Sequence, residues 1–151
     1  MKTILSRWLP VLLWMAFIFF ISSSSTPFKD MLPQSMQTPG GVKFPDTPIG
    51  QLVLPNESAG QISHLGMFFV LGFLLARAFH GRGGAGLAFG LALATLYALS
   101  DEIHQLFVPI RAFQISDLAL DVLGALLGIM IYTKLIEWLD RRKQKVNSSL
   151  P

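Results

Sequence analysis

The sequence predicts an all-α membrane protein: a bundle of four transmembrane helices with a long irregular outer loop between the first two helices. Of the 151 residues, 52% are hydrophobic and 14% are charged, and the mean hydropathy is +0.52. These values lie outside the usual range of soluble domains. The hydrophobic residues also form several long, nearly uncharged runs, and the basic residues gather near the ends of these runs, as in membrane proteins. The length allows one domain over residues 1–151.

Composition also excludes several kinds of chemistry and partner. There is no cysteine, so disulfides, Cys-ligated zinc and thiol catalysis are excluded. The 12 Lys and Arg against 9 Asp and Glu give a net charge of +3, but no base-reading motif or extended basic face accompanies them. We therefore expect membrane lipids and no nucleic acid as partners. The oligomeric state stays open.

The first span is predicted over residues 8–23. Lys2 and Arg7 precede it, and Trp8 and Trp14 are candidates for interfacial anchors. A basic start followed by an apolar stretch also fits a secretory signal. No small-x-small cleavage pattern follows, so we expect a retained helix.

Residues 22–60 are predicted to form the long irregular connection. Six prolines and the pair Gly40-Gly41 lie in it, and prolines at this density prevent regular backbone hydrogen bonding. A connection of this length is either a functional cover or a tether. The second span, residues 62–79, opens with His64. It ends at the glycine-rich stretch 80–84. We interpret this stretch as a basic hairpin rather than a phosphate-binding loop, because no strand precedes it.

The third and fourth spans are predicted over residues 87–108 and 115–135. The apolar run 87–99 alone is too short to cross a bilayer core, which needs about 20 helical residues. The third helix must therefore continue through the polar block that follows. Ser116 is a candidate N-cap for the fourth helix, with Asp117 in its first turn. The basic tail 140–151 is predicted to be disordered.

Basic residues also predict the orientation. They cluster before the first span, around the 80–84 hairpin and after the fourth span. Four spans with both termini in the cytoplasm place every cluster on the inner side. We therefore expect a multi-pass protein of the cytoplasmic (inner) membrane, with the long loop and the polar block toward the outside.

The polar block Ser100-Asp101-Glu102-Ile103-His104-Gln105 is the main candidate site. With about 100° per residue, Asp101, Glu102, His104 and Gln105 occupy one arc about 160° wide. The apolar residues between them lie opposite this arc. Ionisable groups inside a membrane span are costly, and they face protein or a water-filled cavity rather than lipid.

The fourth span carries a matching stripe. One helical face carries Asp117, Asp121, Gly124 and Gly128. Its outer half is acidic, and its inner half consists of small residues. The small half permits close helix contact, and we expect Gly86 and Gly90 of the third span to be its partner surface. Arg111, in the turn between the two spans, could pair with these acids.

Several short stretches of the chain together form a recognisable pattern. They are Ser22-Ser23-Ser24, His64, Asp101-Glu102-Ile103-His104-Gln105-Leu106-Phe107-Val108-Pro109, Arg111, Asp117 and the run 123–128. In this order they resemble the VanZ-like family of small membrane proteins, over nearly the whole chain. The resemblance implies a multi-pass membrane protein of the cell envelope, associated with resistance to the glycopeptide antibiotic teicoplanin. The chain departs from the family pattern in two places. Gly60-Gln61 stand where the family commonly has Asp-Lys, and Asp121 stands where it commonly has Asn.

Two hypotheses for the function follow. In the first, an outward-facing intramembrane pocket engages a lipid, a lipid-linked envelope precursor or a glycopeptide. Its ligand-binding residues are His64, Asp101, Gln105, Arg111, Asp117 and Asp121. In the second, the protein is an enzyme in which Glu102 and His104 act as acid and base on a lipid-linked phosphate or glycosidic linkage.

We predict no cofactor and no metal. A metal set of His64, His104 and Glu102 is the alternative, but no short His-x-x-x-His spacing preorganises it. Each polar residue could instead belong to a buried network that fixes the helix register.

Overall fold

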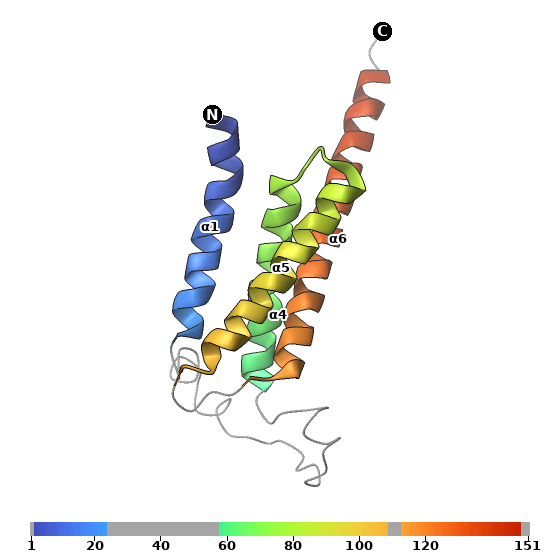
Figure 1. The fold of residues 1–151 in the computed structure, drawn as a ribbon. Helices are drawn as coiled ribbons and strands as arrows, with labels where there is room; N and C mark the ends of the chain where they lie inside the picture. Colours follow the sequence, from blue (N-terminus) through green and yellow to red (C-terminus); the bar gives the residue numbers. More distant parts are fainter. Residues whose placement is uncertain (1, 24–57, 109–112, 149–151) are drawn as a thin grey trace.

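The computed structural model describes residues 2–23, 58–108 and 113–148, and these parts of the chain are helical apart from short turns. Their helices are α1 (Lys2–Ser22), α4 (Ser58–Ala78), α5 (Gly83–Gln105) and α6 (Ile115–Ser148). They run side by side in alternating directions, and both ends of the described chain lie at the same end of the bundle (Figure 1). The all-α class predicted from the sequence is confirmed. The predicted outer loop lies largely outside the described residues.

Three helices are long and apolar enough to cross a membrane, within the described part of the chain. They are Ile4–Ser22, Gly83–Gln105 and Ile115–Ser148. The second predicted span corresponds to α4, whose apolar stretch Ile62–Ala78 is shorter. This helix packs against each of the other three, and it lies between α1 and α6 in Figure 1. A central helix meets protein on several sides, so it depends less on lipid-facing residues than the outer helices do.

The outer surface of the bundle is apolar. Leu12, Phe20 and Phe89 are more than half exposed, whereas the charged side chains of the polar block are buried. This distribution reverses that of a soluble protein and suits a surface covered by lipid. The core between the helices contains Val11, Ile18, Phe68, Leu71, Leu75, Ala78, Ala94, Ala98 and Ala125.

Glycines bring α4 and α6 into close contact. A Cβ added at Gly128 would lie 2.0 Å from the carbonyl oxygen of Phe69, and one added at Gly72 would lie 2.1 Å from that of Ala125. Gly124 faces the carbonyl of Leu65 in the same way. The predicted pairing of this stripe with α5 is therefore wrong: the glycines of α6 pack against α4.

The glycines of α5 also turn away from α6. Gly90 lies against Leu75 and Phe79, while Gly86 lies against Phe79 and Arg82. The glycines of α5 and of α6 thus both face α4 rather than each other.

Two short connections agree with the sequence. Between α4 and α5 the chain turns tightly, with φ of +88° at Gly81 and +61° at Gly83, a conformation that glycine adopts easily. After Gln105, α5 tightens into i to i−3 hydrogen bonds up to Val108, close to the predicted end of the third span.

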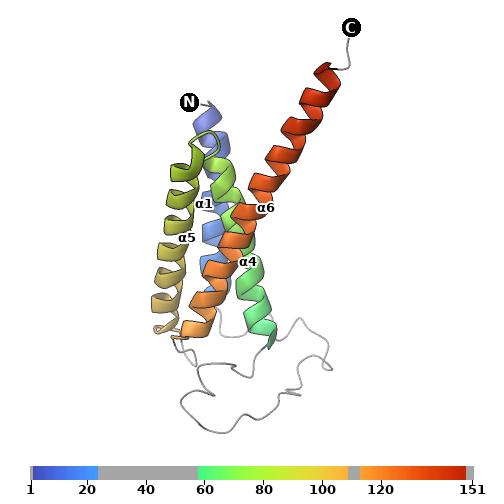
Figure 2. The same cartoon turned by 90° about the vertical axis from the view of Figure 1, so that its right-hand side faces the viewer.

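The fourth helix begins where it was predicted to begin, but its N-cap and its C-terminal end differ from the prediction. It begins at Ile115, so Ser116 lies inside the helix rather than at its N-cap. It continues to Ser148, over a tail for which the sequence predicted disorder. Residues 140–148 contain neither proline nor glycine, and Arg, Lys and Gln are good helix formers. The last turns project beyond the bundle (Figure 2).

Candidate functional site

One end of the bundle holds all the buried polar and charged side chains of the described residues. At this end α1 and α5 finish and α4 and α6 begin (Figure 1). Each helix contributes at least one of them: Ser22, His64, Asp101, Glu102, Gln105, Asp117 and Asp121. We call these seven residues the polar cluster. Three of the four residues of the predicted α5 arc are buried here, Asp101, Glu102 and Gln105, while the apolar residues Leu99, Ile103 and Leu106 are exposed.

His64 joins α4 to α6. Its Nδ1 lies 3.0 Å from Oδ1 of Asp121, and its Nε2 lies 3.9 Å from Oδ2 of Asp117. The contact is possible because Gly124, one turn after Asp121, lets the two helices approach closely. A short aspartate side chain can then reach across to the imidazole. Both acids of the predicted α6 stripe thus lie beside the histidine that opens α4.

Gln105 joins α5 to α1. Its Nε2 donates hydrogen bonds to Oδ2 of Asp101, one helical turn earlier, and to Oγ of Ser22, both at 3.2 Å. Because α1 ends at Ser22, the hydroxyl lies at the same depth as the end of α5. The sequence singled out Ser22 only through the family resemblance, and its place in the network follows from the packing of α1.

Glu102 joins α5 to the start of α6. Its Oε2 accepts a hydrogen bond from the backbone N–H of Gln114 at 2.8 Å. The carbonyl of Gln114 in turn accepts the N–H groups of Asp117 and Leu118. A carboxylate at the beginning of a helix is stabilised by the N–H groups there and by the helix dipole. Glu102 therefore caps α6, a role that the sequence assigned to Ser116.

His104 lies beside the polar cluster rather than in it. It is partly exposed, its Nε2 is 3.0 Å from Oγ of Ser23, and its ring stacks on Phe19 with 4.4 Å between the centroids. The histidine beside the carboxylates is His64. The predicted acid and base, Glu102 and His104, thus contact different helices, α6 and α1.

The cluster retains unused hydrogen-bonding capacity. Three buried carboxylate oxygens have no hydrogen-bond partner among the described residues: Oδ1 of Asp101, Oε1 of Glu102 and Oδ2 of Asp121. An unsatisfied buried acceptor is costly, and a charged one more so. The arrangement can therefore accept protons, donor groups of a ligand or a cation. Arg111, which the sequence placed near these acids, lies outside the described residues.

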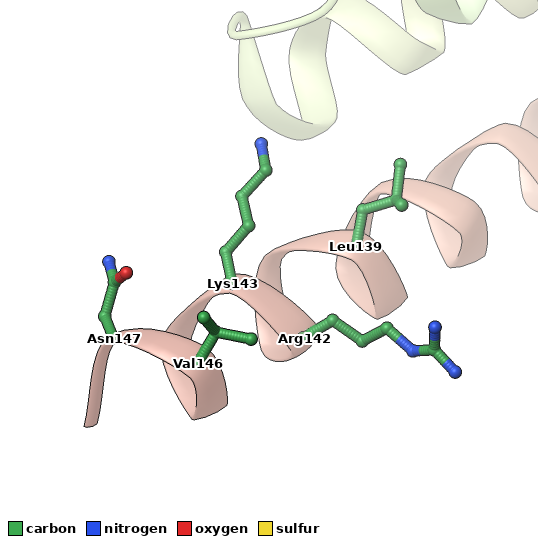
Figure 3. Close-up of a pocket in the computed structure, with 5 residues that line it drawn as sticks. All are labelled: Leu139, Arg142, Lys143, Val146 and Asn147. Carbon is green, nitrogen blue, oxygen red and sulfur yellow. The ribbon is translucent and has the colours of Figure 1, made fainter. Parts of the chain in front are cut away.

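The opposite end of the bundle, where Arg7, Arg82 and the basic turns of α6 lie, has a different surface. We call it the basic end. Hollows there lie along the projecting turns of α6, and one of them is lined by Leu139, Arg142, Lys143, Val146 and Asn147 (Figure 3). A hollow formed by one helix does not enclose a ligand. The polar cluster at the opposite end of α6 is the site with converging side chains from several helices.

The helices and the cluster together define a multi-helix membrane protein with charged groups buried at one end of the bundle. The VanZ/LLP1 family profile matches residues 7–137, most of the chain, and the chain belongs to this family. No curated protein matches the chain, and no solved structure does.

Proposed function

We propose that this protein is an envelope protein of the cytoplasmic (inner) membrane with both termini in the cytoplasm. The two ends of the described chain lie at the same end of the bundle (Figure 1). At that end lie Arg7, the Arg82 turn and the basic turns of α6. The excess of Lys and Arg on the cytoplasmic side sets the orientation of most membrane proteins. The polar cluster then faces the outer side.

Cysteine labelling tests the orientation, because the chain contains no cysteine of its own. A Gly40→Cys variant is expected to react with a membrane-impermeant maleimide added outside intact cells. An Asn147→Cys variant is expected to react only after the membrane is opened. Labelling of position 147 from outside, with position 40 protected, would reverse the assignment.

We further propose that the polar cluster engages the polar part of a lipid or a lipid-linked envelope component. The supporting observation is the set of three unpaired carboxylate oxygens buried where four helix ends meet. Carboxylates are acceptors only, so the ligand groups that fit them are hydroxyl and ammonium donors, as found on head groups and sugars. Through such a component the protein would alter susceptibility to glycopeptides such as teicoplanin, the role that the family resemblance implies.

Photocrosslinking and susceptibility assays test this proposal together. Cells that express the wild type are expected to differ from cells without it in teicoplanin susceptibility, and a photoactivatable lipid is expected to crosslink to residues around the cluster. Asp101→Asn removes a charge and is expected to weaken both effects. Glu137→Gln, a matched change on exposed α6, is expected to leave both unchanged. Equal behaviour of the two variants would contradict the proposal.

A second candidate function is acid/base catalysis on a lipid-linked phosphate or glycosidic linkage. It is favoured by the 3.0 Å contact between His64 and Asp121, since a carboxylate that orients an imidazole is a common catalytic arrangement. Glu102→Gln separates the two functions, because it keeps the shape and removes the charge. An enzyme that uses Glu102 as its acid should lose nearly all turnover, whereas a binding site should keep part of its effect.

A further inference from the structure

The part of the polar cluster formed by His64, Asp101, Glu102 and Asp121 brings potential metal ligands together from three helices. Each of the four residues offers one ligand atom, a ring nitrogen or a carboxylate oxygen, and these atoms all lie within 4.8 Å of one another. All four residues are buried, with relative exposures between 0% and 5%. We propose that these four residues bind a divalent cation.

The unpaired oxygens point to a ligand independently of the clustering. Asp101, Glu102 and Asp121 each use one carboxylate oxygen in a hydrogen bond to a neighbouring residue. The second oxygen of each is buried without a partner among the described residues. Each of the three carboxylates thus keeps one free oxygen. The side chains of Asp101 and Glu102 are already oriented by hydrogen bonds from residues outside the proposed ligand set.

Charge favours a cation over a neutral ligand. When ionised, the three carboxylates carry three negative charges, and His64 supplies at most one positive charge. Buried charges of one sign are strongly unfavourable unless they are paired or coordinate a metal. A divalent ion with neutral His64 would reduce three negative charges to one.

The donor set restricts the kind of cation. An imidazole with carboxylates suits Mn²⁺ or Zn²⁺, whereas Ca²⁺ and Mg²⁺ prefer oxygen ligands throughout. Neighbouring groups would orient the ligands, as they do in other metal sites. Gln105 donates to Asp101, the Gln114 N–H donates to Glu102, and Asp117 lies on the Nε2 side of His64.

The sequence alone does not reveal this set. A metal site from His64, His104 and Glu102 lacked a preorganising spacing, and the structure instead places His104 against α1. The ligands come from the first turns of α4, the last turns of α5 and the first turns of α6. They meet only when the three helices pack.

The test is metal binding by the full-length protein in detergent, without added lipid. After treatment with EDTA and buffer exchange, the protein is titrated with Mn²⁺, and free Mn²⁺ is followed by its EPR signal. The wild type is expected to bind one Mn²⁺ per chain and to release it to Zn²⁺. Mn²⁺ should also raise its thermal unfolding temperature, which needs no variant and so does not depend on how a variant folds.

Variants locate the ion. Asp101→Asn and Asp121→Asn each remove a ligand charge and are expected to weaken Mn²⁺ binding on the order of 100-fold. Asp117→Asn should weaken it less, by about 10-fold, as for groups that orient a ligand. Glu137→Gln and Asp140→Asn remove exposed acids from α6 and should leave binding unchanged.

Three results would overturn the assignment. The first is no Mn²⁺ binding by the wild type up to about 1 mM, the weak end of functional cation sites. The second is unchanged Mn²⁺ binding in both Asp101→Asn and Asp121→Asn. The third is a loss of Mn²⁺ affinity in the Glu137→Gln control as large as in these two variants. The site concerns the same cluster as the proposed function but needs no lipid. Metal binding without lipid crosslinking would therefore disprove the lipid ligand alone, and crosslinking without metal binding would disprove the metal alone.

Discussion

The two ends of the bundle use charge in opposite ways. At the acidic end, Asp101, Glu102 and Asp121 are buried. Glu102 and Asp121 bond to residues that helix packing has brought beside them, and Asp101 bonds to Gln105 one turn later in the same helix. At the basic end, Arg7, Arg82 and the Arg and Lys side chains of α6 are exposed. Two of them lie over aromatic rings, Arg82 over Phe79 and Arg142 over Trp138.

This difference separates charges that depend on the fold from charges that do not. A buried carboxylate loses its compensation when a neighbouring helix moves, so the acidic end is coupled to the packing of all four helices. An exposed cation remains solvated in any packing. The acidic end should therefore respond strongly to conservative substitutions, and the basic end should tolerate them.

The largest expected effect is at Asp121. Replacing it with Ala removes the 3.0 Å partner of His64 and leaves a buried imidazole facing the remaining acids. Removing one partner of a buried pair leaves the other polar group uncompensated, and the cost reaches about 3–5 kcal/mol when the pair is ionised. Reversible unfolding in mixed micelles measures this loss. Glu137→Ala, at a surface ion pair, is the matched control, and an equal loss there would remove the distinction between the two ends.

The next largest effect is expected at the contact between α4 and α6, and it tests whether this contact supports the acidic end. Gly128→Ala places a Cβ 2.0 Å from the Phe69 carbonyl oxygen, and the backbone must move to make room. Overpacking of this kind costs about 1–3 kcal/mol. Gly66→Ala, on the exposed side of α4 with no atom within 4 Å of the new Cβ, should instead stabilise the helix by up to about 1 kcal/mol. Destabilisation by both variants would show that helix contact is not the cause.

The sequence was sufficient to predict the features that the helical period determines. Once residues 87–108 are taken as a helix, the period alone places Asp101, Glu102 and Gln105 on one face, and the structure buries all three. The acid and glycine stripe of α6 follows in the same way. Both predictions use one helix at a time, so they require no knowledge of its neighbours.

The sequence was insufficient where the choice of neighbour decides. Gly124 and Gly128 indicate that some helix comes close, but not which one, and the predicted partner was α5 rather than α4. His104 lies at the edge of the predicted arc, and α1 meets that edge through Ser23. The cap on α6 was missed for a related reason, since the acceptor for the Gln114 N–H lies on the preceding helix.

A smaller effect is expected at that cap. Glu102→Gln keeps an acceptor near the Gln114 N–H but removes the charge that the helix dipole favours. The loss should be about 0.5–1 kcal/mol, within the range for charges at helix ends. It should be concentrated at the start of α6, as faster hydrogen exchange of residues 113–118. Uniformly faster exchange along α6 would mean that Glu102 acts on the whole cluster rather than as a cap.

The smallest effect is expected at the basic end. Arg142→Gln removes a cation that lies 4.2 Å from the centroid of the Trp138 ring, on turns of α6 that project beyond the bundle (Figure 2). An exposed cation–π contact contributes about 0.5–1 kcal/mol at most, and solvent near these exposed turns reduces it further. Unfolding of the bundle should therefore change by a few tenths of a kcal/mol, in the same micelle assay as for Asp121. A loss comparable to that of Asp121→Ala would show that the projecting turns are part of the folded core, and that charge at both ends depends on packing.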